Sequence, residues 1–96
     1  MIKVGNYIIY DWEKSEYHTS NDESSYFRPC DDGVTIFSIF LFYAGNSTWV
    51  LHIHNKLLLT YYKSMFHNCM EFNSFEAGKT KVDLFVEKLQ KLKVFL

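Results

Sequence analysis

The sequence predicts an α+β protein: an antiparallel β-meander of four to six strands with one C-terminal amphipathic helix packed on one face. Two observations predict this class. Residues 34–54 hold two apolar runs on either side of a Gly-Asn turn, which is typical of a hairpin. The last third of the chain carries apolar residues at helical spacing. A length of 96 residues and a hydrophobic content of 48% predict a single domain, 1–96, with its own core.

The first third of the chain predicts one bent strand and then a long irregular segment. Residues 2–12 alternate loosely and are rich in Ile and Tyr, with a bend expected at Gly5-Asn6. Residues 13–33 are polar. We expect at most a short strand there, at Ser25–Arg28, cut by Pro29 because proline cannot donate to a strand ladder. A long irregular segment in a small domain indicates function or mobility.

The strongest predicted strand is Val34–Tyr43, which is apolar on both faces. Such a strand is expected to be central and covered on both sides. After a turn at Ala44–Ser47, Thr48–His54 is the predicted return strand. Its alternation directs two sets of side chains to opposite faces, Trp49, Leu51 and Ile53 on one and Val50, His52 and His54 on the other.

The segment after His54 has two interpretations. We favour a tight turn at Asn55-Lys56, a third strand of the meander at Leu57–Tyr62 and a further strand at Phe66–Phe72. In the alternative, Asn55 is the N-cap of a helix that runs from Lys56 to His67.

The C-terminal helix is predicted by a capping segment and an apolar stripe. Asn73 and Glu76 have capping-box spacing. Gly78 costs about 1 kcal/mol relative to alanine, which is tolerable where the helix packs closely on the sheet. The stripe consists of Val82, Phe85, Val86, Leu89 and Leu92. Because one helix cannot cover a broad sheet, the other sheet face is covered by residues 13–33, exposed, or buried against a partner.

Composition and motifs exclude several classes of function. A net charge of −1, a single arginine and the lack of an RNA-binding sheet motif argue against a nucleic-acid partner. The longest apolar run is too short to cross a bilayer, and the first residues lack a signal-peptide pattern, so we expect a cytoplasmic protein. Cys30 and Cys69 are expected to be reduced thiols. No nucleophile elbow or phosphate loop is present, which predicts a protein that is not an enzyme.

Two histidines in one strand raise the alternative of a metal site. His52 and His54 are two residues apart and therefore project from the same face. His67 and Cys69 repeat that spacing, and imidazole and thiolate are both zinc ligands. No spacing matches a structural zinc knuckle, so we expect no cofactor. A zinc site on these four residues is the alternative, and His52→Ala would abolish it.

The surplus of aromatic residues favours a protein-binding function. Aromatic residues make up 19% of the chain, and Tyr and Trp are enriched at interface anchors. Residues 1–48 hold seven acidic against three basic side chains, whereas residues 49–96 hold seven lysines against four acidic side chains. The acidic, aromatic first half suits a protein that covers a basic site. The expected partner-binding residues are Trp12, Tyr17, Asp22, Glu23, Tyr26, Asp31 and Asp32.

These features together predict a non-enzymatic protein-binding module. Its most concrete form is a small inhibitor that occludes a basic site, such as a toxin-neutralising immunity protein or a phage or mobile-element protein directed against a host enzyme. Residues with A/T-rich codons greatly outnumber Gly, Ala, Arg and Pro, which favours such an origin. The alternatives are the zinc domain and a homo-oligomeric structural domain, such as a homodimer, whose uncovered sheet face is the subunit interface.

Overall fold

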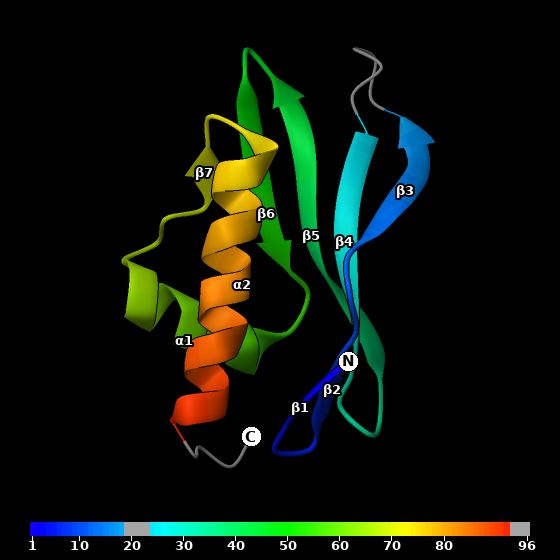
Figure 1. The fold of residues 1–96 in the computed structure, drawn as a ribbon, viewed down its shortest axis with the longest axis vertical. Coiled ribbons are helices and arrows are strands. Elements are labelled where there is room, and N and C mark those ends of the chain that lie inside the picture. Colours follow the sequence, from blue (N-terminus) through cyan, green and yellow to red (C-terminus); the bar gives the residue numbers. More distant parts are fainter. Residues whose placement is uncertain (19–23, 93–96) are drawn as a thin grey trace.

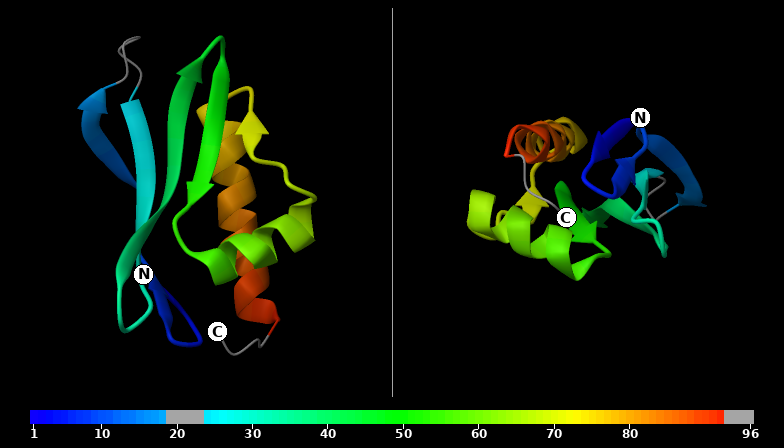
Figure 2. Two further views of the ribbon diagram at one scale, coloured as in Figure 1. Left: turned by 180° about the vertical axis from the view of Figure 1, so that it is seen from behind. Right: turned by 90° about the horizontal axis from the view of Figure 1, so that it is seen from below.

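The computed structural model describes residues 1–18 and 24–92 and confirms the α+β class. Its seven strands form one antiparallel sheet in the order β1-β2-β4-β5-β6-β7, and β3 pairs with β4 beside β2 (Figure 1). The elements are β1 Ile2–Val4, β2 Tyr7–Ile9, β3 Glu13–His18, β4 Ser24–Asp31, β5 Ile36–Gly45, β6 Thr48–Ile53, α1 Lys56–Phe66, β7 Glu71–Phe72 and α2 Phe75–Lys91. The sheet curls, so that β1 and β5–β7 all contact α2 (Figure 2).

The N-terminal third is more regular than the sequence predicts. The segment 2–12 is not one bent strand: β1 and β2 form a hairpin that turns at Gly5, whose φ is 58°. Residues 13–33 are not largely irregular either, because β3 and β4 pair with each other.

Pro29 lies inside β4 and does not cut it, which corrects the predicted strand end. The carbonyl of Pro29 accepts a hydrogen bond from Tyr10 N, at 2.8 Å. In a strand, the N–H and C=O of one residue point to the same neighbour. The donor that proline lacks therefore faces the gap between β2 and β3, and the pairing of β4 with β5 is undisturbed.

The strands predicted at Leu57–Tyr62 and Phe66–Phe72 are wrong, and the alternative helix is confirmed as α1. The Asn55 side chain accepts a hydrogen bond from Leu58 N at 3.0 Å and caps the helix. Leu58 and Tyr62, one turn apart, are fully buried, and the Tyr62 ring meets Phe85 of α2 edge-on. Only the short β7 remains of the second predicted strand.

Helix α2 packs its predicted stripe on the sheet. Val82, Phe85, Val86 and Leu89 are buried, whereas Leu92 at the end of the stripe is half exposed. The N-cap is Ser74 rather than Asn73, since the Ser74 hydroxyl accepts from Ala77 N. The close approach expected at Gly78 is confirmed: a Cβ there would lie 2.9 Å from the Leu41 side chain.

The expectation that the strand at 34–43 is covered on both sides is wrong. Its odd-numbered residues, Phe37, Ile39 and Leu41, are buried against the helices. Its even-numbered residues point away from the core, and no element lies in front of β4, β5 and β6 when the molecule is seen from behind (Figure 2, left).

Within the described residues, no helix has the length and apolar character needed to cross a membrane.

Candidate functional site

A patch of apolar and aromatic side chains covers the sheet face that turns away from the helices. We call it the open face and define it by Phe27 of β4, Phe40 and Phe42 of β5, and Val50 and His52 of β6. Phe27, Phe40 and His52 are cross-strand neighbours in one row, and Phe42 pairs with Val50 in the next. None of the five belongs to the core or packs against it.

The rings of the open face contact one another in a continuous series. Phe27 and Phe40 stack with ring centroids 6.1 Å apart, and Phe40 is 6.2 Å from Phe42. The ring of His52 lies 5.0 Å from that of Phe42. These cross-strand contacts hold the rings in place, but only on one side. Phe27, Phe40, Phe42 and Val50 are half-buried and His52 is exposed, so the outer side of the series is partly open to solvent.

Two carboxylates flank the open face, one on each side. Glu13 lies opposite Phe27 at the β3 edge, and Glu71 lies opposite Val50 at the β7 edge. Within the described part of the chain, neither forms an ion pair or a side-chain hydrogen bond, whereas Asp83 and Glu87 are both paired with lysines. The rim of the open face is therefore acidic, and its carboxylates are available to an external cation.

A hollow continues the open face at the β7 edge. Its volume is about 480 Å³, and it is lined by Val50, Asn68, Cys69, Met70 and Glu71. Because Val50 and Glu71 are cross-strand partners on the open face, the hollow and the aromatic series form one surface.

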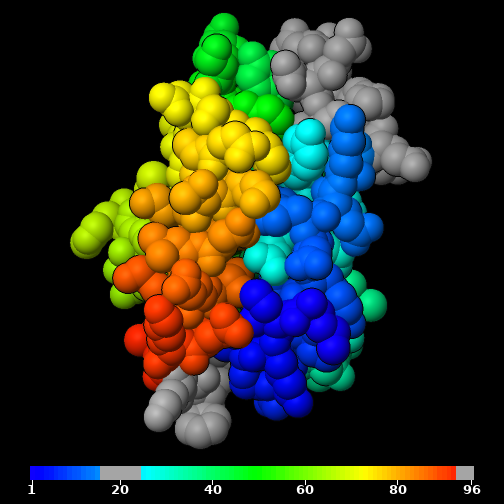
Figure 3. All heavy atoms as spheres, in the orientation of Figure 1, coloured from blue at the N-terminus to red at the C-terminus, as the bar shows by residue number. Residues whose placement is uncertain are grey.

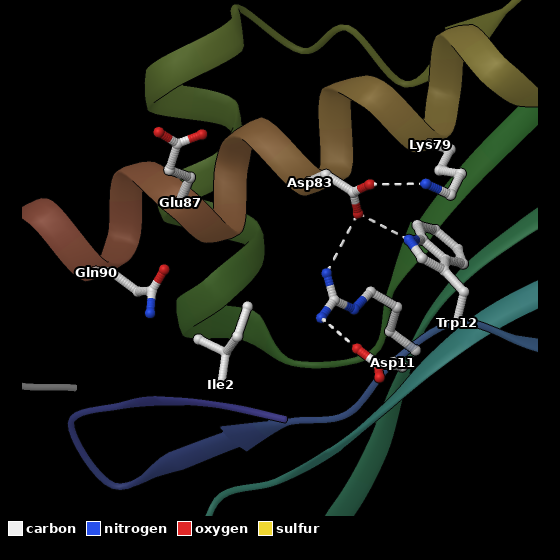
Figure 4. Close-up of a pocket in the computed structure, with 8 residues that line it drawn as sticks. Ile2, Asp11, Trp12, Lys79, Asp83, Glu87 and Gln90 are labelled. Atoms are coloured by element: carbon white, nitrogen blue, oxygen red, sulfur yellow. Dashed lines mark hydrogen bonds and ion pairs between the residues drawn. The ribbon is translucent and has the colours of Figure 1, made fainter.

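A second, polar pocket lies on the opposite side of the molecule, where α2 meets the N-terminal segment (Figures 3 and 4). Its volume is about 430 Å³. Arg28 lies at its base with a side chain only 5% exposed. The guanidinium donates from Nε to the Tyr10 carbonyl at 2.7 Å and from Nη1 to Asp83 Oδ1 at 3.2 Å, and Nη2 lies 4.0 Å from Asp11.

Asp83 connects the groups of this pocket to one another. Besides Arg28, it accepts hydrogen bonds from Trp12 Nε1 at 2.7 Å and from Lys79 Nζ at 3.1 Å (Figure 4). No buried side-chain nitrogen or oxygen of the described residues lacks a partner. Asp83 thus joins Arg28, Trp12 and Lys79 and fastens α2 to the sheet, which makes this part of the pocket a structural cross-link.

Burial raises the pKa values of two titratable side chains, Cys30 and Tyr62. Burial raises the pKa of the Cys30 thiol to about 12, an effect that the nearby Arg28 only partly opposes. Cys30 is therefore a poor nucleophile at neutral pH. Burial, and then the neighbouring Cys69, raise the pKa of Tyr62, whose hydroxyl donates to the Cys69 carbonyl.

Four of the predicted partner-binding residues are described with their side chains, and they lie at two separate places. Trp12 meets the ring of Phe75 edge-on, and Tyr26 stacks on Phe75 with centroids 4.0 Å apart, so both hold α2 on the sheet. Asp31 and Asp32 build the turn after β4 by accepting backbone N–H bonds, and those from Thr35 and Val34 lower the pKa of Asp32. The other three predicted residues are not described by the structure: Asp22 and Glu23 lie outside the described ranges, as does the side chain of Tyr17.

The structure brings together two of the four predicted zinc ligands. The ring of His52, on the open face, lies 6.1 Å from the ring of His54. His67 ends α1 in the left-handed conformation, and Cys69 lines the hollow. Among the described residues, no three His, Cys, Asp or Glu side chains are grouped closely enough to hold a metal ion.

Sequence reasoning identified His52 of the open face, but as a candidate zinc ligand, and it missed the aromatic neighbours of His52. The pattern predicted a covered layer for Phe40 and Phe42, and it did not distinguish Phe27 or Glu13 from their neighbours. A usable signal was the single predicted helix, which cannot cover both apolar faces of the strand Val34–Tyr43. Comparisons of the chain with protein-family models, with curated proteins and with solved structures find no match.

Proposed function

We propose that the protein is a non-enzymatic protein-binding module that binds through the open face. Its partner would be a protein surface with an apolar centre surrounded by lysine or arginine side chains. The observation that carries the proposal is the series of rings from Phe27 to His52, fixed on the sheet and uncovered on its outer side. Acting by occlusion, such a module is an inhibitor of whatever function its partner's basic surface performs.

Charge complementarity favours a basic partner over a second copy of this chain. The open face is bordered by Glu13, Glu71 and Asp31. A cation of the described chain on the same sheet face, Lys3, lies further away: the strand pairing places it on β1, two strands beyond Asp31 on β4. Two open faces stacked on each other would bring like charges together, which costs free energy. Basic side chains around an apolar patch would instead pair with the rim. Both cysteines are free thiols, which supports a cytoplasmic site of action.

A pair of matched variants tests the proposal. The tagged chain is expressed in its source cells, and its complexes are weighed by native mass spectrometry. Phe40→Ser removes a ring from the open face without touching the core, and Leu84→Ser removes a side chain that is 38% exposed on α2. We expect wild type and Leu84→Ser to retain the same heterologous partner at fixed stoichiometry. Phe40→Ser is expected to lose it, because a central aromatic anchor contributes about 2 kcal/mol or more.

Two results would overturn this function. One is a partner that Phe40→Ser retains as well as the wild type does, which would locate the interface elsewhere. The other is a complex that contains only copies of this chain and is lost in Phe40→Ser, which would make the open face a dimer interface.

A further inference from the structure

We propose that the hollow at the β7 edge binds one arginine side chain of the partner protein, an inference that rests on the proposed function of the open face. The hollow is lined by Val50, Asn68, Cys69, Met70 and Glu71. It differs from the polar pocket under α2 in one decisive respect: its carboxylate has no partner among the described residues.

The backbone that shapes the hollow is fixed on both sides. His67 and Asn68 are consecutive left-handed residues, with φ of 52° and 62°, and they turn the chain back sharply after α1. Cys69 N then donates to the Phe66 carbonyl, and Met70 accepts from Leu51 N at 2.8 Å. The turn and this bond to β6 hold the wall of the hollow in place. A ligand would therefore meet a preformed cavity, which reduces the cost of ordering it.

The hydrogen-bonding groups of the hollow select a cation. The carbonyls of Cys69 and Met70 are already occupied, by the Tyr62 hydroxyl and Leu51 N. The side chains of Glu71 and Asn68 form no hydrogen bond within the described chain, so an anionic acceptor and an amide oxygen remain available. An anion would be repelled by Glu71, and an apolar side chain would remove water from that carboxylate without replacing its hydrogen bonds.

Among cations, an arginine side chain fits this combination best. Its methylene stem can lie along the apolar surfaces of Val50 and Met70 while its charged end stays at the rim. The planar guanidinium offers five N–H donors, enough to bond a carboxylate with two and an amide oxygen with a third. A lysine ammonium is a compact and strongly hydrated charge that does not match two separated acceptors as well.

The hollow can be tested without knowing the partner. Nα-acetyl-arginine methylamide is titrated into the full, isotope-labelled chain, and backbone amide shifts are followed by NMR. Nα-acetyl-citrulline methylamide, a neutral molecule of nearly the same shape, is the matched control ligand. We expect saturable shifts confined to Val50 and residues 68–71 with arginine, weaker shifts with the lysine analogue, and none with citrulline. Equal shifts with citrulline, or arginine shifts spread over the chain, would overturn the inference.

Variants of two unpaired glutamates separate the hollow from the rest of the open face. Glu71→Gln is expected to weaken arginine binding about tenfold. Glu76→Gln, an exposed change on α2, should leave it unaltered. In the purified complex, one outcome is that the Phe40→Ser variant loses the partner while the Glu71→Gln variant binds it normally. That result would refute the arginine site in the hollow and leave the proposed function of the open face standing. Arginine binding in the hollow, combined with a partner indifferent to Phe40→Ser, would refute the function alone.

Discussion

Removal of Asp83 should destabilise the fold far more than removal of any other described carboxylate of α2. The Asp83→Ala variant loses three interactions at once: the Trp12 indole bond at 2.7 Å, the Arg28 guanidinium bond at 3.2 Å and the Lys79 pair. It also leaves Arg28, whose side chain is 5% exposed, with only a carbonyl and a distant Asp11 as acceptors. Removing one partner of a buried charge is costly because the other charge stays desolvated.

The size of the effect follows from the exposure of each group. A hydrogen bond to a charged group contributes about 1.5–3 kcal/mol when it is buried, but the Asp83 side chain is 38% exposed, so solvent screens its charge. The Lys79 pair, on the helix surface, adds about 0.4 kcal/mol. We therefore expect a loss of about 3 kcal/mol in the free energy of unfolding. For a chain of this length, that corresponds to a fall of about 12 °C or more in Tm.

Urea denaturation followed by circular dichroism measures this loss, with Glu87→Ala as the matched control. Glu87 lies one turn further along α2 and pairs with Lys91 on the exposed surface, so its removal should cost about 0.5 kcal/mol or less. Asp83→Asn, which keeps an oxygen acceptor without the charge, should fall between the two alanine variants. Equal losses for Asp83→Ala and Glu87→Ala would refute the view that the pocket is a cross-link.

Two further predictions concern the core. Gly78→Ala should lower the free energy of unfolding by about 1 kcal/mol despite the higher helix propensity of alanine, because the added Cβ would lie 2.9 Å from the fully buried Leu41. The exposed change Thr80→Ala on the same helix should instead stabilise, so destabilisation by Thr80→Ala or a gain from Gly78→Ala would contradict the packing. Because the pKa of Cys30 is raised from 9.0 to about 12, the unfolded chain releases this proton first as pH rises. The contribution of Cys30 to stability is thus retained below about pH 9 and lost above it, by about 1.4 kcal/mol per pH unit. The urea midpoint of Cys30→Ala should therefore fall less between pH 8 and pH 10 than the midpoint of the wild type.

The fold class was predictable from local patterns, and the errors arose where those patterns were ambiguous. Leu57, Leu58 and Leu59 satisfy both helical and strand periodicity, and the preference for a strand failed because Asn55 caps a helix that packs on Phe85. The strand predicted at Ser25–Arg28 was too short, because proline is tolerated in β4 only where the gap between β2 and β3 leaves its missing donor unneeded, and no local signal reveals that gap.

The candidate site was less predictable than the fold because it depends on strand register. Glu13 and Phe27 become neighbours only through the pairing of β3 with β4. Likewise, Trp12 and Tyr26 have the composition of interface anchors, but the approach of Phe75 from α2 occupies them. The proposed binding residues lie on the sheet face that the helices do not contact, and this face is known only once the helices are placed.

The most direct test of the open face compares two charge reversals by the affinity of the chain for its purified partner at several salt concentrations. Glu13→Lys reverses a carboxylate on the rim, and Glu76→Lys makes the same change in net charge on α2. The account predicts that Glu13→Lys weakens binding about tenfold at low salt, less at high salt, and that Glu76→Lys has little effect. Equal effects of the two reversals, or an affinity that neither changes, would contradict it.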